Sequence, residues 1–222
     1  MIFRDRIDAA QQLAAALDRY RGRDALVLAI PRGGVPMGRV IADALAAELD
    51  VVLVHKLGSP GQPELAMGAV DESGEALVGA EARYLHVSAE AFEAERLRQL
   101  ELLRKRRALY TPVHPPSAVR DRIVLVVDDG MATGATMIAA LRAVRRRHPR
   151  ELVAIAAVMP AEVQDRLARE ADRVVCLHAP AWFGAVGEFF EDFSQVEDDE
   201  VIRMLAAPRV RTPAPPVSEA PP

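Results

Sequence analysis

Short runs of consecutive apolar residues alternate along most of the chain with longer stretches in which apolar residues recur at helical spacing. The apolar runs have the length of β-strands and occur at residues 25–30, 51–57, 122–129, 152–159 and 173–178. The helical stretches occur at residues 5–20, 35–49, 133–147 and 161–170. Buried strands that alternate with helices are typical of a parallel sheet covered on both faces. The pattern therefore predicts an α/β fold with a doubly wound, Rossmann-like parallel sheet.

The alternation is interrupted after the second of these strands. Residues 58–79 are rich in glycine, proline and acidic side chains and contain only two weak strand patterns. Residues 88–110 predict one long helix, with Ser88 as its N-cap. We expect residues 58–118 to form a lid or insertion, which either closes over a site or belongs to a larger hood or dimer contact.

The last part of the chain differs from the alternating part. An aromatic cluster at residues 182–193 precedes a short acidic helix at residues 197–205, and we expect residues 180–206 to form a hood segment. Residues 207–222 are rich in proline and are expected to be disordered. The length of the remaining chain predicts a single domain over residues 1–206.

Composition narrows the class of protein. Half of the residues are apolar and 27% are charged, as in soluble globular proteins. The lone cysteine, Cys176, excludes an internal disulfide and a cysteine-based metal site, which favours a cytoplasmic location. No apolar stretch is long enough for a membrane span, and the N-terminal segment has charges where a signal peptide has its apolar core.

The charge is unevenly distributed along the chain. The net charge is −4, which together with the 5% aromatic content makes nucleic acid an unfavourable partner. Residues 1–150 contain 22 basic and 19 acidic side chains, whereas residues 151–222 contain 6 and 13. The mildly basic first part is therefore compatible with a small anionic substrate.

The segment VLVVDDGMATGATM, residues 124–137, has the strongest chemical signal. An apolar strand ends in Asp128 and Asp129, and a short loop rich in glycine and threonine then opens a helix. Ligands of open α/β sheets bind beyond the carboxyl ends of the strands, where this loop would lie. The two carboxylates can accept hydrogen bonds from neighbouring sugar hydroxyls. A bare pair of aspartates would more often only cap the strand and the helix.

The loop after the two aspartates is suited to a phosphate group. Backbone N–H groups at a helix N-terminus face an anion with a favourable dipole, and glycines allow close backbone approach. The loop is neither a Walker A loop nor a G-x-G-x-x-G loop. The residues together predict a receptor for a ribose 5-phosphate, composed of Asp128, Asp129, Gly130, Met131, Ala132, Thr133, Gly134, Ala135 and Thr136.

This segment resembles the phosphoribosyl-diphosphate binding motif of the type I phosphoribosyltransferases, and the resemblance extends from about residue 5 to about residue 205. It implies that Asp128 and Asp129 hold the ribose hydroxyls and that residues 130–136 hold the 5-phosphate. It also implies transfer of the phosphoribosyl group to a ring nitrogen of a nucleobase-like acceptor, and a homodimer. Mg²⁺ would be held mainly by substrate oxygens and water, with no protein metal ligands.

A second element supports the resemblance. The sequence AIPRGG, residues 29–34, ends the first strand, where the family has its pyrophosphate-binding loop, often with a strained peptide bond. Arg32 can neutralise diphosphate charge, and Gly33 and Gly34 let backbone N–H groups approach it. Lys56, at the end of the second predicted strand, could reach the same diphosphate, although a lysine at a strand end is usually solvated. Arg32 and Lys56 are the predicted catalytic residues.

The acceptor is the least determined part of the prediction. In family members that use 6-oxopurines the residue before Thr-Gly is typically acidic, whereas this chain has Ala132. The resemblance therefore favours an adenine-like, uracil-like or unassigned acceptor. Trp182 and Phe183 either stack on a base or fill the core below the hood. The alternative function is a non-catalytic module that binds phosphoribosyl diphosphate and regulates a partner.

Overall fold

The strands of the central sheet are all parallel. The computed structural model describes residues 2–59, 62–79 and 87–208. Within them the strand order of this sheet is β2-β1-β6-β7-β8. Its members are β1 (Leu26–Ala29), β2 (Glu48–Val51), β6 (Ile123–Gly130), β7 (Glu151–Val158) and β8 (Arg173–His178). The predicted doubly wound α/β fold is confirmed.

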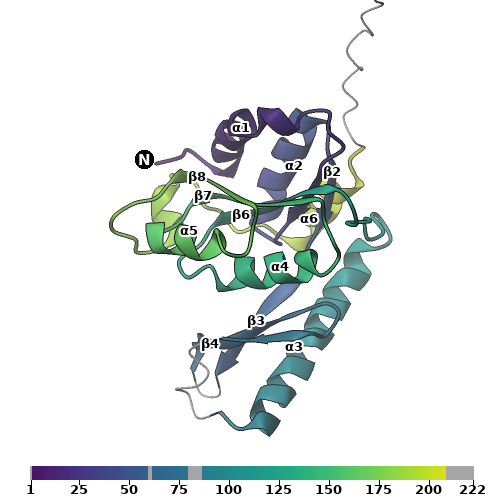
Figure 1. Cartoon of the computed structure of the whole chain (residues 1–222), viewed down its shortest axis with the longest axis vertical. Coiled ribbons are helices and arrows are strands. Elements are labelled where there is room, and N and C mark those ends of the chain that lie inside the picture. Colours follow the sequence, from purple (N-terminus) through teal and green to yellow (C-terminus); the bar gives the residue numbers. More distant parts are fainter. Residues whose placement is uncertain (1, 60–61, 80–86, 209–222) are drawn as a thin grey trace, which may run out of the picture.

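Helices cover both faces of this sheet (Figure 1). One face is covered by α1 (Arg6–Ala16) and α2 (Gly34–Leu45), and the other by α4 (Ala135–Arg145) and α5 (Ala161–Leu167). Successive side chains of β6 enter opposite cores: Leu125 and Val127 pack with the first pair of helices, and Val124 and Val126 with the second. Burial on both faces explains why the strand is apolar throughout until its carboxyl end.

A second sheet projects from the central body below α4 (Figure 1). It is antiparallel, in the order β3-β4-β5, and the long helix α3 packs against it. These elements are β3 (Val54–Ser59), β4 (Gln62–Asp71), β5 (Ala76–Val78) and α3 (Ala89–Tyr110). Ser88 accepts a hydrogen bond from the backbone of Ala91 as the predicted N-cap.

The second sheet corrects two sequence predictions. The apolar run 51–57 is not one strand of the parallel sheet, because β2 ends at Val51 and the chain then leaves for β3. At the start of the expected lid or insertion, the described residues of segment 58–70 form strands rather than a loop, because they belong to β3 and β4. Gly68 of β4 lies close to β5, because a Cβ there would be 2.2 Å from the Leu77 carbonyl oxygen. The predicted helix 35–49 is also too long, because α2 ends at Leu45 and Glu48 opens β2.

Charged side chains connect the insertion to the central body. Arg107 of α3 donates to Glu72 at 2.6 and 2.9 Å, to Asp50 of β2 at 3.3 Å and to the Val51 carbonyl at 3.1 Å. Asp50 is 2% exposed. Arg146, the C-cap of α4, pairs with Asp71 of β4. The Arg107–Asp50 and Arg146–Asp71 pairs therefore both connect the insertion to the central body.

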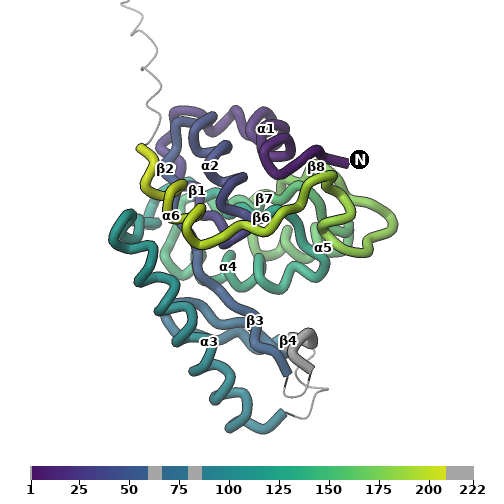
Figure 2. The backbone as a smooth tube through the Cα atoms, turned by 180° about the vertical axis from the view of Figure 1, so that it is seen from behind, coloured from purple at the N-terminus to yellow at the C-terminus, as the bar shows by residue number. Residues whose placement is uncertain are grey.

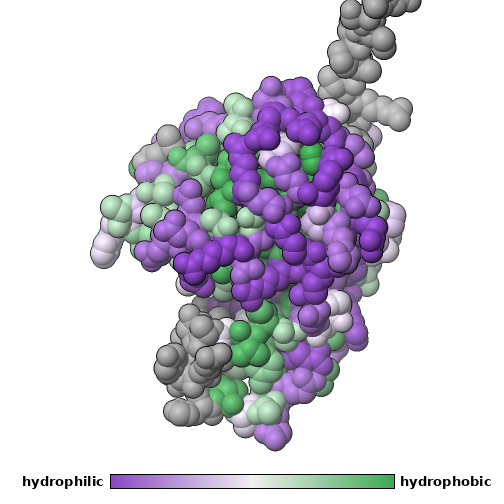
Figure 3. All heavy atoms as spheres, in the orientation of Figure 1, coloured by the Kyte–Doolittle hydropathy of each residue, from purple (hydrophilic) through white to green (hydrophobic). Residues whose placement is uncertain are grey.

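The segment after β8 runs back across the central body to α6 (Asp198–Ala206), which lies beside α2 and α3 (Figure 2). The central body shows mostly hydrophilic side chains in Figure 3, and apolar ones come to the surface over the second sheet. Within the described part of the chain, no helix has both the length and the apolar character needed to cross a membrane. The predicted disorder of residues 207–222 lies outside the described residues from 209 onward.

Candidate functional site

Two adjacent carboxylates mark the carboxyl end of β6. The backbone N–H of Asp129 donates to Asp128 Oδ1 at 2.9 Å. The Asp129 side chain is 12% exposed, and Asp128 is half-buried. Both border a cleft of about 430 Å³, lined by Arg6, Arg32, Gly33, Asp128, Asp129, Val186, Phe193, Gln195 and Val196. The cleft lies where an open α/β sheet binds its ligands.

The surroundings of this acidic pair make the charged state costly. Burial raises the pKa of Asp128 well above its usual range, and the charge of Asp129 raises it further. Burial also raises the pKa of Asp129, and the Arg6 guanidinium acts in the opposite direction on both groups. Carboxyl groups whose pKa is raised by burial and by a neighbouring charge are typical of functional positions, because their charged form does not stabilise the fold.

Arg6 was not predicted from the sequence. Its Nε donates to Asp129 Oδ2 at 2.9 Å, across 123 residues of chain. One local signal exists: Arg6 is the first residue of α1, where the helix dipole disfavours a positive charge. A cation at that position indicates an acidic partner elsewhere in the fold.

The loop after β1 reaches the cleft. Arg32 lines the cleft, with its side chain 28% exposed, and donates to Glu197 at 3.1 Å. The peptide bond between Pro31 and Arg32 is cis. Gly33 lies directly against the acidic pair, because a Cβ there would be 2.2 Å from Asp129 Oδ2. Gly34 packs on the backbone of β6, where a Cβ would be 2.6 Å from the Val127 carbonyl oxygen.

Gly33→Ala is expected to destabilise the fold by about 1–3 kcal/mol, because the added methyl group overlaps the Asp129 carboxylate. Calorimetric melting measures the loss. In an Asp129→Ala background the same substitution should lower the stability much less, because the carboxylate that the methyl group overlaps is absent. Equal losses of stability in the two backgrounds would show that the contact with Asp129 is not the reason for a glycine at position 33.

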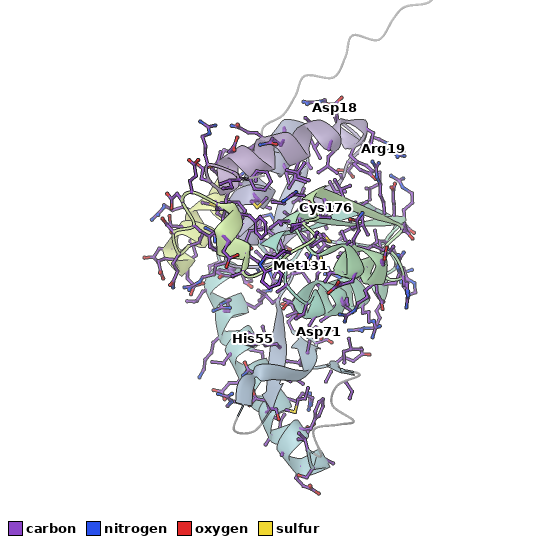
Figure 4. The ribbon with its side chains drawn as sticks, turned by 90° about the vertical axis from the view of Figure 1, so that its left-hand side faces the viewer. Asp18, Arg19, His55, Asp71, Met131 and Cys176 are labelled. Carbon is purple, nitrogen blue, oxygen red and sulfur yellow. The ribbon has the colours of Figure 1, made fainter. Side chains whose placement is uncertain are left out.

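The loop between β6 and α4 continues the site. Gly134, with φ +71°, precedes α4, and the backbone N–H of Ala135 reaches the Thr133 hydroxyl at 3.4 Å. Arg166 of α5 donates to the Thr133 carbonyl at 3.2 Å. Figure 4 shows Met131, at the start of this loop, above His55 and Asp71 of the second sheet. The loop follows the cleft directly, although residues 131–136 are not among those that line it.

Three further predicted residues, Lys56, Trp182 and Phe183, also lie away from the cleft lining. Lys56 is inside β3 rather than at the end of a central strand, so that part of the prediction is wrong, while its role at a diphosphate stays a prediction. Trp182 is 84% exposed, which excludes the core interpretation for this residue. Phe183 is half-buried against the core, with its ring 5.2 Å from that of Phe189.

The fold and the site together define a class: an open, doubly wound α/β protein with a cleft at the carboxyl edge of its sheet that is lined by an acidic pair and two arginines. A family model of the phosphoribosyl transferase domain matches residues 2–193. The chain belongs to this family. The match ends before α6, so Glu197 lies beyond it.

Relatives with high similarity support the family. The crystal structure of TT1426 from Thermus thermophilus has 43% sequence identity and a TM-score of 0.81, covering 93% of this chain and 98% of that one. MT0597 and Rv0571c, from two strains of Mycobacterium tuberculosis, are 41% identical over 205 residues, and their names give phosphoribosyl transferase as a provisional assignment. The matches cover 92% of this chain but 46% of each relative. The chain thus spans about half the length of these curated relatives.

Proposed function

We propose that this protein transfers the 5-phosphoribosyl group from phosphoribosyl diphosphate to a ring nitrogen of a nucleobase-like acceptor. The observation that carries the proposal is the cleft in which the Asp128–Asp129 pair faces the Arg32–Gly33 loop. The pair provides acceptors for sugar hydroxyls, and the loop provides a cation and a close-lying backbone for a diphosphate.

The roles of the chain's own groups follow from this arrangement. Asp128 and Asp129 accept hydrogen bonds from the ribose 2- and 3-hydroxyls, and the backbone of residues 130–136 binds the 5-phosphate. In the reaction the bond from the sugar C1 to diphosphate oxygen breaks, and its electron pair leaves with the diphosphate. The acceptor nitrogen forms the new bond to C1 and releases its proton to solvent. Arg32 stabilises the charge that develops on the leaving group.

Mg²⁺ fits a site of this composition. In the described residues, no group of three or more histidine, cysteine or acidic side chains could hold a metal ion. An ion that enters with its substrate would need no such group, and Arg32 and the acidic pair would position that substrate. When bound in that way, Mg²⁺ neutralises diphosphate charge.

The acceptor would use the apolar part of the cleft. Val186, Val196 and the Gln195 amide line it, which suits a flat heterocycle with a hydrogen-bonding edge. Phe193 is not a stacking platform, because the Arg6 guanidinium lies 3.8 Å from its ring centroid and the Phe190 ring stacks on it at 5.0 Å. The neutral Ala132 before Thr133 continues to favour an acceptor other than a 6-oxopurine.

Phosphoribosyl diphosphate with Mg²⁺ is expected to raise the melting temperature, because a ligand at 100 times its Kd stabilises a fold by about 2.7 kcal/mol. Asp129→Asn should remove the shift, and Arg4→Gln, a change at a 73% exposed side chain, should keep it. An unchanged melting temperature of the wild type at millimolar ligand would contradict the proposal.

Pyrophosphate release against a panel of bases identifies the acceptor. Release with one base supports the transferase and names its substrate class. Tight binding without release for any base would instead favour a non-catalytic module that senses phosphoribosyl diphosphate.

A further inference from the structure

We propose that Arg6 is a positioning residue of this site, which fixes the Asp129 carboxylate and fastens the strap, residues 193–196, over the cleft. The proposal rests on the proposed function, because it assigns Arg6 to the binding of phosphoribosyl diphosphate. It extends that function to a residue outside both sequence motifs, on a helix that precedes the sheet.

The contacts of Arg6 join two walls of the cleft. Nε donates to Asp129 Oδ2 at 2.9 Å, and Nη1 donates to the Ser194 carbonyl at 2.7 Å. The guanidinium carbon lies 3.8 Å from the ring centroid of Phe193, in cation–π distance. The side chains of Arg6 and Asp129 are each 12% exposed, so the contact between them is largely shielded from water. One guanidinium therefore connects the acidic pair to the strap.

A third wall touches the same pair. A Cβ on Gly33 would be 2.2 Å from Asp129 Oδ2 and 3.5 Å from Arg6 Nη2. The predicted diphosphate loop thus packs against the Arg6–Asp129 contact itself. A displacement of Arg6 would therefore also displace the strap, the acidic pair and this loop.

The charges around the cleft leave Arg6 as the cation in direct contact with the pair. Asp128 and Asp129 come from β6, Arg32 comes from the loop after β1, and Glu197 lies next to the strap and pairs with Arg32 at 3.1 Å. Asp192, just before the strap, is a further carboxylate in the field of Arg6. A carboxylate accepts two sugar hydroxyls better than a protonated acid, so a cation at Asp129 favours the binding-competent state.

The experiment compares wild type, Arg6→Gln and Arg6→Lys, with Arg4→Gln as the matched control on the same segment. The Kd for phosphoribosyl diphosphate with Mg²⁺ is measured by calorimetry from pH 5.5 to 8.5. Arg6→Gln should weaken binding about tenfold at pH 8. It should also shift the acid limb of the binding profile, which is the fall in affinity at low pH, upward by about 1–3 pH units. The reason is that a neighbouring cation lowers a carboxyl pKa by that amount.

Arg6→Lys separates charge from geometry. Lysine keeps the charge but cannot present the planar fork that reaches both Asp129 and Ser194. Its acid limb should therefore stay near that of the wild type, while its affinity falls. A merely structural Arg6 would move the affinity of both variants and leave the acid limb of Arg6→Gln in place, which would overturn the proposal.

A ligand-free measurement distinguishes failure of this inference from failure of the proposed function. Carboxyl-carbon NMR titration of Asp129 should show a higher pKa in Arg6→Gln than in the wild type and in Arg4→Gln. If the wild type binds no phosphoribosyl diphosphate, the proposed function fails, and with it the ligand assigned to Arg6. If the wild type binds phosphoribosyl diphosphate and Asp129 has the same pKa in Arg6→Gln as in the wild type, only the role proposed for Arg6 is wrong. Should Arg6→Gln not fold, Arg6→Lys tests the positioning role alone, and an affinity equal to that of the wild type would overturn it.

Discussion

Asp128→Asn is expected to stabilise the folded chain and, at the same time, to remove most of its affinity for phosphoribosyl diphosphate. The wild-type carboxylate is desolvated and lies beside Asp129, and both effects raise its pKa. Asparagine removes the charge and keeps an Oδ1 acceptor for the Asp129 backbone N–H, which donates to Asp128 Oδ1 at 2.9 Å. We expect a gain of ~2–6 °C in melting temperature at pH 8 and a loss of about 100-fold in affinity.

The pH dependence of this gain has a defined sign. A carboxyl group whose pKa is raised by folding binds its proton more tightly in the folded state than in the unfolded one. Its contribution to stability is full below the unfolded pKa of about 3.9 and is lost as the pH rises through the raised folded value. The advantage of Asp128→Asn should therefore grow with pH across that window and shrink as the pH falls.

Melting curves between pH 5 and 8 measure the advantage, and Asp129→Asn is the matched comparison. Asp129 differs from its neighbour because Arg6 donates to it at 2.9 Å. Asparagine at position 129 leaves that guanidinium without its carboxylate, so this variant should melt below the wild type. Stabilisation by both substitutions, or by neither, would contradict the distinct electrostatic roles of the two residues.

The central sheet and the main motif could be predicted from the sequence because their signals are local. The run 122–129 is long and apolar enough for a strand buried on both faces, and Asp128 and Asp129 end it. The stretch after it has helical spacing, with α4 over Ala135–Arg145. Given a parallel sheet, these patterns place the acidic pair at the carboxyl edge without further information.

The second sheet could not be predicted in the same way. Val51 and Val54 belong to one unbroken apolar run, yet they lie in different sheets. Such a run does not mark where the chain leaves one sheet, because its apolar residues are buried in both strands. The pairing partner of β3 is β4, whose single glycine and single proline, Gly68 and Pro63, favour a loop when sequence alone is considered.

Arg6 and the aromatic segment show a further limit. The partner of Arg6 is 123 residues away, and only its unfavourable position at a helix start pointed to one. The rings of Phe183 and Phe189 pack on each other at 5.2 Å, and those of Phe190 and Phe193 at 5.0 Å, whereas Trp182 is exposed. Composition identifies an aromatic cluster but not which rings face inward.

Arg107→Leu is expected to cause the largest loss of stability among these substitutions. Arg107 bonds Glu72 of the insertion together with Asp50 and Val51 of the central body. Removing it leaves the carboxylate of Asp50, 2% exposed, without its cation. Breaking a buried ion pair from one side costs about 3–5 kcal/mol, which lowers the melting temperature of a chain of this size by roughly 10 °C.

Arg104→Leu is the matched control, because Arg104 lies one turn earlier on α3 and is exposed; its cost should be within about 0.5 kcal/mol. Adding Asp50→Asn to Arg107→Leu should recover part of the loss, since the uncompensated charge is then absent. Hydrogen exchange of the backbone amides shows which elements lose stability in Arg107→Leu. Faster exchange in β3, β4 and α3, with little change in β6 and β7, would show that Arg107 fastens the insertion. Equal exchange in both sheets, or no recovery in the double variant, would mean that Arg107 stabilises through packing rather than through its ion pairs.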